Sequence, residues 1–436
     1  MLKRILIKGY KSLLNVDVSL QPLSVLFGPN AAGKSNFLDA LQLLSRIVCC
    51  RSLKEAFEPP YRGKPLESFA FDSGGLSELI ERDSASFSIQ ADIELSPHIV
   101  EAVDRQIAEM RRPPNGTGLK PSAGHGTASV VHERLLRYRI EVQVLPRSGI
   151  LRVSDEYLAA LNREGEPTGK RKPFLERMNN RLHLRMEGQA HPTYFERYLD
   201  HSILSKPLYT PHYPHLSALR RELESWMFYY FEPRERMRTN NAVKEIVHVG
   251  LMGEELAAFL NTLKARNELQ FKAIEKALHQ IVPSVTGVEV EVNTLGEVEL
   301  RLREGDRLIP ARVVSEGTLR ILGLLAIGSS SEPPGLTGFE EPENGVHPRR
   351  IQLIAERLKS HTRSGDKQII VTTHSTLLAD LMPNDSLFAC GKESGGTIVQ
   401  PYKNLLPLWR DREIADAMNA EDVPLSTRIL RGDLDA

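Results

Sequence analysis

Short apolar runs alternate along this chain with stretches in which apolar residues recur every three or four positions. The largely apolar run from 23 to 27 predicts a buried strand. A glycine-containing stretch follows, and then Phe37, Leu41, Leu44 and Val48 recur at helical spacing. The chain is therefore expected to open with a strand, a loop and a helix.

A similar succession returns in the last third of the chain. The segment 288–302 alternates apolar and polar residues, as a half-buried strand does. Helical spacing begins after Ser315, which is a good N-cap, and again after His347. The β-branched run 368–373 predicts another buried strand. Strands that alternate with helices in this way indicate an α/β fold.

The loop after the first strand, residues 28–35, reads GPNAAGKS and fits the phosphate-binding pattern GxxxxGKS. Its glycines let the backbone curl round an anion, and its N–H groups and the following helix N-terminus point at phosphate oxygens. Lys34 is expected to reach the β- and γ-phosphates of ATP, and Ser35 to bind Mg²⁺. The alternative, a glycine turn before an ordinary core helix, fits the flanking strand and helix less well. The expected ATP contacts in this loop are Gly28, Asn30, Ala31, Ala32, Gly33, Lys34 and Ser35.

A pair of carboxylates, Glu340 and Glu341, ends a short hydrophobic segment far downstream. In P-loop ATPases the first acid at such a place holds Mg²⁺ and the next polarises the attacking water. Exposed acidic pairs are common, so the prediction depends on the next strand of the chain. That strand, 368–373, ends at His374, and polar residues at the carboxyl ends of strands build sites in open α/β sheets. We expect Glu340 to bind the metal, Glu341 to act as general base, and His374 to contact the γ-phosphate or the water.

The segment SEGTLR, from Ser315 to Arg320, has two readings. In the simpler one, Ser315 only caps a helix. In the other, Ser315 and Gly317 at a helix start form a second anion site. Two phosphate-binding helix starts on one chain favour a head-to-tail homodimer, in which each P-loop faces the partner's serine across the nucleotide.

These motifs, in this order, resemble those of ABC-class ATPases of the RecF/SMC/OLD-nuclease branch, and in particular its stand-alone bacterial AAA-type ATPases. The resemblance implies that the segment from Ser315 to Gly317 is the signature that acts across a dimer, and that Asn344-Gly345 is the D-loop. It also implies that Lys11, Ser12 and Asn36 lie near the nucleotide phosphates. The first acid of the pair is usually aspartate in such proteins, whereas Glu340 is one methylene longer.

The separation of the motifs predicts the domain organisation. Glu340 follows Gly28 by 312 positions (340 minus 28). The expected fold is an α/β ABC-type P-loop ATPase head, with a mixed sheet core, helices and a β lobe, split by a mainly helical insertion. We expect the first ATPase lobe at 1–95, the insertion at 96–280 with a flexible linker near 113–128, and the second lobe at 281–436. Strands are expected at 86–95, 137–144, 149–153, 386–389 and 396–399, helices over most of 155–280, and no long coiled coil, because sustained heptads are absent.

Composition limits the expected partners and cellular compartment of the protein. Lysine plus arginine and aspartate plus glutamate both number 56, so the net charge of zero gives no sign of a nucleic-acid partner. Three cysteines cannot form a disulfide framework, and no apolar run is long enough for a membrane span, so we expect a cytoplasmic protein without a membrane partner. Basic clusters could contact DNA or be solvated faces; they are Arg111-Arg112, residues 170–172, Arg220-Arg221 and Arg234 with Arg236 and Arg238.

The expected function is inferred from these motifs and the resemblance. The chain would dimerise on ATP, hydrolyse it to ADP and phosphate, and act on DNA or on a separate effector, a nuclease or toxin, in antiphage defence or DNA repair. An ATP-gated scaffold with little turnover and a RecF-like DNA-binding ATPase are the alternatives. A transporter subunit fits poorly, because the motifs are widely split and SEGT replaces LSGGQ. The terminal Asp433-Leu434-Asp435 reads as an acidic tail and not as part of a nuclease domain.

Overall fold

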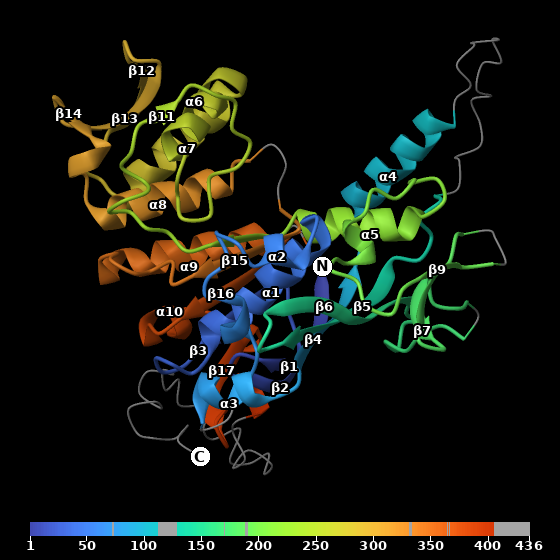
Figure 1. Ribbon diagram of the computed structural model, residues 1–436. Helices are drawn as coiled ribbons and strands as arrows, with labels where there is room; N and C mark the ends of the chain where they lie inside the picture. The colour runs from blue at the N-terminus through green and yellow to red at the C-terminus, as the bar shows by residue number, and fades with distance from the viewer. Residues whose placement is uncertain are drawn as a thin grey trace, which may run out of the picture. The chain divides into compact units, whose positions relative to one another are not determined.

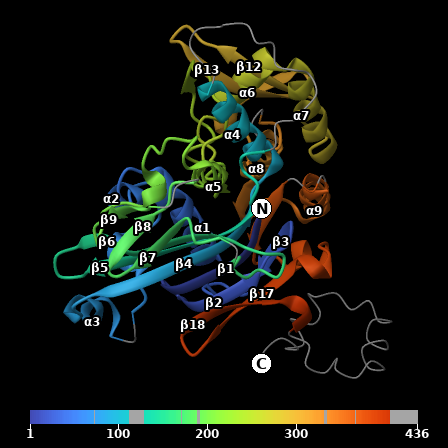
Figure 2. The ribbon, with the colours of Figure 1, turned by 90° about the vertical axis from the view of Figure 1, so that its right-hand side faces the viewer.

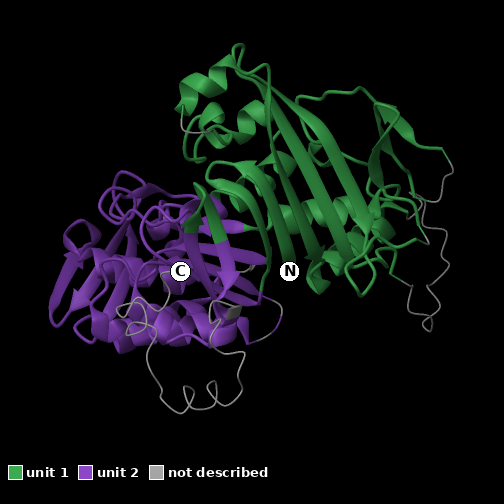
Figure 3. Ribbon diagram, turned by 90° about the horizontal axis from the view of Figure 1, so that it is seen from below, with its two compact units in different colours: residues 1–20, 39–226, 392–398 green, residues 21–38, 227–391, 399–436 purple. Residues whose placement is uncertain are grey.

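The computed structural model describes residues 1–71, 74–111, 129–169, 171–187, 191–330, 334–363, 365 and 367–404. They form two compact units, shown in Figure 3: unit 1 comprises 1–20, 39–226 and 392–398, and unit 2 comprises 21–38, 227–391 and the residues from 399. These units are defined by contacts between residues, and their boundaries differ from the predicted divisions at 95 and 280. The predicted ATPase lobes and insertion remain a prediction. The predicted linker at 113–128 and the acidic tail lie outside the described residues.

Unit 1 is built on an antiparallel sheet of eight strands in the order β2-β1-β4-β5-β6-β7-β8-β9. Its long central strands bury alternate residues, which is the pattern of a sheet with one face on the core. The strands are β1 (Leu2–Tyr10), β2 (Leu13–Ser19), β4 (Ala85–Glu94), β5 (Leu135–Leu145), β6 (Ile150–Ala160), β7 (Leu175–Met178), β8 (Arg181–Leu184) and β9 (Thr193–Phe195). The helices are α2 (Leu53–Ala56), α3 (Gly75–Glu81), α4 (Pro97–Met110) and α5 (Pro214–Glu224), and α1 (Lys34–Cys49) runs from unit 2 into unit 1.

Unit 2 contains a six-stranded sheet in the order β10-β15-β16-β3-β17-β18, and its pairs from β10 to β17 are parallel. Figure 1 shows β3, β15 and β16 next to one another at its centre. The strands are β3 (Leu23–Phe27), β10 (Met227–Tyr229), β15 (Leu336–Glu340), β16 (Gln368–Thr373), β17 (Leu387–Glu393) and β18 (Gly396–Pro401). The last two strands run partly into unit 1. β3 and β16 are buried at every position, as strands covered on both faces must be.

A smaller sheet in unit 2 packs against two helices, α6 (Leu256–Arg266) and α7 (Glu268–Ile281), as Figures 1 and 2 both show. Its strands are β11 (Asn241–Ala242), β12 (Gly287–Val292), β13 (Glu297–Glu304) and β14 (Arg307–Pro310). One core of buried apolar side chains joins this sheet to α8 (Glu316–Ile327), α9 (Pro348–Thr362), α10 (Thr376–Asp380) and the parallel sheet. Helix α8, which the predicted signature segment opens, therefore packs inside a single core with the parallel sheet.

The predicted mixed α/β class is confirmed, with one correction inside the insertion. The strands expected at 86–95, 137–144 and 149–153 are present as β4, β5 and β6. Residues 155–195, for which the sequence predicts mainly helix, instead contain the end of β6 and the strands β7, β8 and β9. These short strands have few β-branched residues, so their sequence carries little strand signal. Among the described residues after 155, the first α-helix is α5. Among the described residues, no helix is long and apolar enough to cross a membrane.

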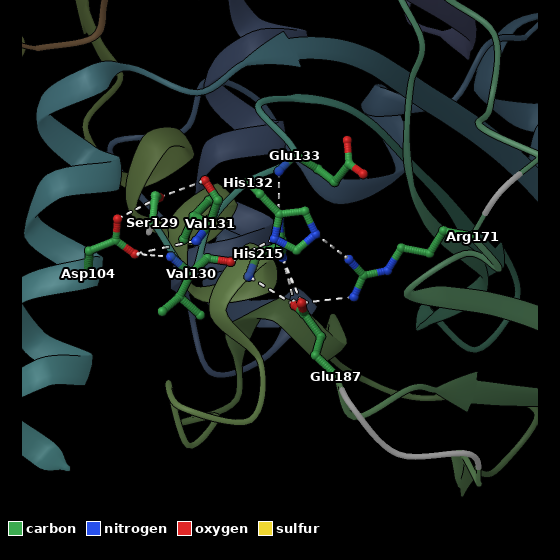
Figure 4. Close-up of polar contacts among 9 residues, drawn as sticks. All are labelled: Asp104, Ser129, Val130, Val131, His132, Glu133, Arg171, Glu187 and His215. Carbon is green, nitrogen blue, oxygen red and sulfur yellow. Dashed lines mark hydrogen bonds and ion pairs between the residues drawn. The ribbon is translucent and has the colours of Figure 1, made fainter. Parts of the chain in front are cut away.

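A buried histidine ties three segments of unit 1 together (Figure 4). The His215 side chain is fully buried at the start of α5, where its Nδ1 lies 2.8 Å from the Glu187 carboxylate and its Nε2 accepts the Glu133 N–H at 3.1 Å. Arg171 donates to the same carboxylate at 2.8 Å. Burial would raise the pKa of Glu187, but the hydrogen bonds from His215 and Arg171 outweigh it and hold that pKa below its ordinary value. Both ring nitrogens of His215 are engaged, so this contact is structural.

Candidate nucleotide site

Three strand ends of the parallel sheet carry the predicted chemical groups. β16 lies between β3 and β15, with Thr373 paired to Phe27 and Thr372 paired to Glu340. Gly28, Glu341 and His374 are each the first residue after one of these strands. Because the strands are parallel and in this register, the three residues meet at the carboxyl edge of the sheet, where α/β folds bind ligands.

The P-loop backbone has conformations that explain its glycines. Gly28 has φ 153°, and a Cβ added to it would lie 2.2 Å from the backbone oxygen of Cys390, so no side chain fits there. Gly33, just before α1, has φ 95°, in the region that favours glycine. Ala31 has φ 65° and Ala32 is buried. The loop is thus already curled before a helix start, which is the geometry that binds phosphate.

Lys34 is 6% exposed and folds back on its own loop. Its ammonium donates to the carbonyl oxygens of Gly28 and Pro29, both at 2.9 Å. Burial lowers the pKa of Lys34, and the surrounding acidic groups oppose that shift. Among the described residues, the acceptors of this buried ammonium are two neutral carbonyls, so it would gain much from phosphate oxygens, which would take their place.

Ser35 and Glu340 come together as predicted. The Ser35 hydroxyl donates to Oε1 of Glu340, which joins α1 to the end of β15. One hydroxyl and one carboxylate are hard oxygen donors, and Mg²⁺ is usually held by one or two such groups together with phosphates and water. The described residues contain no group of three or more His, Cys, Asp or Glu side chains that could hold a metal ion. The pair therefore fits Mg²⁺ bound jointly with a nucleotide, and the longer Glu340 still reaches Ser35.

Glu341 and His374 also meet, since Nδ1 of His374 lies 3.1 Å from Oε1 of Glu341. Both side chains stay partly exposed, at 28% for Glu341 and 47% for His374, so water can reach them. Glu341 has φ 47°, a left-handed conformation that costs a non-glycine residue about 1–2 kcal/mol. Its N–H is held by the carbonyl of Thr372 at 2.9 Å, which fixes the turn. Backbone strain of this kind is often found at functional sites.

The predicted signature opens α8, as its N-cap pattern indicates. Ser315 is exposed, and its hydroxyl accepts the Thr318 N–H at 3.2 Å. A Cβ added to Gly317 would lie 2.4 Å from the carbonyl oxygen of Gly345, so the signature helix touches the predicted D-loop of the same chain. The glycine at 317 is required for this close approach, whatever else it binds.

Two arginines of the basic cluster at 234–238 hold this signature segment. Arg234 pairs with Glu316 at 2.5 Å, and Arg238 donates to the carbonyl of Val314 at 2.8 Å. The sequence pointed to them only as a charged cluster. Their contacts to groups far along the chain could not be read from spacing.

Lys11 and Ser12 lie in unit 1, whereas the P-loop lies in unit 2. Lys11 has φ 45°, and its ammonium pairs with Asp39 at 2.7 Å. The Ser12 hydroxyl shares a hydrogen bond of 2.7 Å with Thr397. Contact of Lys11 and Ser12 with phosphate stays a prediction, as it does for the exposed Asn30 and for Asn36 on α1.

Comparison with known proteins matches the chain to an AAA-domain family and to a few individual proteins. A family model described as "AAA domain, putative AbiEii toxin, Type IV TA system" matches residues 23–97 and 195–380, well over half of the chain. An OLD nuclease of Thermus scotoductus is 21% identical over an alignment of 418 residues, and the match covers 92% of this chain and 64% of that protein. The chain thus spans less than two thirds of that relative's length.

The fold is similar to that of one solved SMC head. The crystal structure of an SMC head bound to the C-winged helix domain of ScpA has a TM-score of 0.51 at 12% identity, and the match covers 91% of this chain and 97% of that chain. An Smc head with an extended coiled coil from Pyrococcus furiosus has a TM-score of 0.46 at 11% identity, over 95% of this chain and 99% of that chain.

Proposed function

The chain belongs to this AAA-domain family, with the fold of RecF-, SMC- and OLD-like ABC ATPases, and from that membership we propose that it binds and hydrolyses ATP in the cytoplasm. The active form would be a homodimer that acts on DNA or on a separate effector protein. The observation that carries the proposal is the meeting of Gly28, Glu341 and His374 at the ends of three adjacent parallel strands.

ATP binding is assigned to the P-loop. Lys34 would leave the carbonyls of Gly28 and Pro29 and donate to phosphate oxygens, while loop N–H groups hold the other oxygens. Ser35 and Glu340 would hold Mg²⁺, which neutralises phosphate charge when it is bound.

The hydrolytic step is assigned to Glu341. As the water oxygen bonds to the γ-phosphorus and the bond to the ADP oxygen breaks, the water proton passes to the Glu341 carboxylate. His374 lies against that carboxylate and orients it, and its exposed ring can also contact the γ-phosphate. The fixed turn at Glu341 keeps the carboxylate at the sheet edge.

A second chain would complete each site. Ser315 is exposed at the start of α8, a helix of 12 residues whose first N–H groups suit an anion. Two copies arranged head to tail place each signature on the partner's γ-phosphate, so that ATP is bound between the two chains. ATP binding and dimerisation are then coupled.

The downstream role is proposed from the OLD nuclease relative. We assign to this chain the ATP-driven part, which would control a nuclease or toxin as its effector. Antiphage defence or DNA repair is the process that this arrangement suits. ATP-dependent closure of the dimer would release or assemble the effector.

ATPase turnover per chain should rise with chain concentration, because an isolated chain supplies only half of each site. The rise should level off at the concentration where sedimentation in the presence of ATP shows a dimer. A turnover per chain that stays constant at concentrations where only the monomer is present would contradict the shared site.

A further inference from the structure

Arg320 is a buried cation on the signature helix with no partner among the described residues. Its side chain is 8% exposed, its Nε is fully buried, and it makes no hydrogen bond or ion pair with any residue that the structure describes. Burial lowers the pKa of this guanidinium, against the attraction of Glu316, Glu341 and Glu343. An arginine is almost always paired when it is buried, because the loss of hydration is otherwise uncompensated.

Glu343, in the loop after β15, has a buried acceptor atom without a hydrogen-bond donor among the described residues. It is 5% exposed, and its Oε1 accepts the Thr373 hydroxyl at 2.5 Å. Its Oε2 is buried without a hydrogen-bond partner among the described residues. Burial raises the pKa of Glu343, although the Thr373 bond opposes the shift. A buried donor on one element and a buried acceptor on another are thus both unsatisfied.

The two elements that carry these groups already touch. Gly317 lies three residues before Arg320 on α8, so both are on one helix face. That face meets the loop after β15 where Gly317 approaches the carbonyl of Gly345. The absence of a Cβ at Gly317 permits this close contact, and Arg320 on the same face is attracted by the carboxylates of Glu341 and Glu343.

Glu343 also connects to the catalytic edge. The Thr373 hydroxyl that donates to Glu343 also accepts the Ser375 N–H at 2.9 Å. Thr373 and Ser375 are the chain neighbours of His374, so this bond links the residues on its two sides. His374 in turn contacts Glu341. A change at Glu343 is therefore transmitted through Thr373 to the residue that orients the general base.

We propose that Arg320 and Glu343 are positioning residues that pair when ATP closes the dimer, with Arg320 Nε–H donating to Glu343 Oε2. The proposal rests on the proposed function, because the trigger is phosphate binding at the Ser315 end of α8. A change of the Arg320 rotamer, as α8 shifts along its neighbouring loop, satisfies both buried groups. Closure on the partner's ATP is then sensed at His374 through Glu343 and Thr373.

The test is a double-mutant cycle in the full chain with Arg320→Met, Glu343→Gln and the double variant. For each protein, kcat, KM and ATP affinity are measured. Each single change should lower kcat about tenfold with ATP affinity within about twofold, and the double variant should be no slower than either single one. Arg320→Lys should recover part of kcat, because it restores the charge. Glu356→Gln, an exposed glutamate on α9 that pairs with Lys359, is the matched surface control and should leave kcat unchanged.

A second readout does not need hydrolysis. Without nucleotide the pair is unmade, so neither change should lower the Tm of the nucleotide-free protein. In a Glu341→Gln background, each change should remove part of the Tm rise on adding ATP, again without additivity. If the wild type hydrolyses no ATP yet this cycle shows coupling, the proposed activity fails and the pairing stands.

Three results would overturn the pairing. Additive effects of the two changes on kcat or on the Tm rise would show that the residues act separately. A Tm loss already complete without ATP would show a purely structural role. A loss of ATP affinity on Arg320→Met alone, with Glu343→Gln unaffected, would make Arg320 a ligand of the phosphate.

Discussion

Lys34→Ala should weaken ATP binding by roughly a hundredfold or more, which removes turnover at ordinary ATP concentrations. The ammonium is buried at the P-loop, and its hydrogen-bond acceptors in the described part of the chain are the carbonyls of Gly28 and Pro29. Both acceptors of the Lys34 ammonium are neutral carbonyl oxygens. Bound ATP would replace them with charged phosphate oxygens, which form stronger hydrogen bonds. Alanine removes the formal positive charge of the loop that faces the phosphates. A binding titration with a fluorescent ATP analogue measures the effect.

Lys8→Ala serves as the control, because Lys8 is an exposed lysine on β1. That variant should bind ATP as the wild type does. An unchanged affinity of the Lys34→Ala protein, shown to be folded by its circular dichroism, would remove the P-loop assignment.

Glu341→Gln should lower turnover by about a hundredfold or more while ATP binding survives. Glutamine keeps the shape of the side chain and its contact with His374 but cannot accept a proton. Steady-state hydrolysis and a binding titration on the same preparation separate the two effects. Because bound ATP is no longer consumed, the variant should also accumulate as the ATP-bound dimer.

Turnover near the wild-type rate in the Glu341→Gln protein would show that Glu341 is not the general base. Glu340 and His374, at the same sheet edge, would then be the candidates. Loss of ATP binding together with turnover would instead mean that Glu341 is needed to form the site. A scaffold that uses ATP only as a gate would assemble normally in this variant.

The parts of the site that local sequence determines were predictable. The strand 23–27, the glycine loop and α1 follow one another directly, so one short window contains the anion site. The N-cap Ser315 and the strand 368–373 have equally local signals. The register of β3, β15 and β16 then brings separate windows together, as a parallel sheet of this type requires.

Long-range contacts between residues were not predictable. Nothing near Gly28 indicates that the carbonyl of Cys390 excludes a side chain there. The partner of Lys11 is Asp39 on α1, and only the tertiary fold of unit 1 brings these two residues together. The unmatched groups of Arg320 and Glu343 become visible only when the burial of each atom is known.

The compact units also needed the structure. Unit 1 takes in residues 392–398, which lie far beyond its other segments in the sequence. A short strand such as β18 belongs to a unit because of the strands it pairs with. No change of composition marks the point at which the chain passes from unit 2 to unit 1. The same applies to β7, β8 and β9, whose few residues are held by neighbours in the sheet more than by their own propensity.

If each ATP site is built from two chains, mixing two inactive variants should restore activity. Ser315→Arg blocks the signature and leaves the P-loop intact, whereas Lys34→Ala does the opposite. In a heterodimer purified through two different tags, one site carries both lesions and the other carries none. We predict that each variant alone is inactive and that the heterodimer regains up to about half of the wild-type turnover, from its one intact site. A proven heterodimer that is as inactive as its two parents would contradict the account.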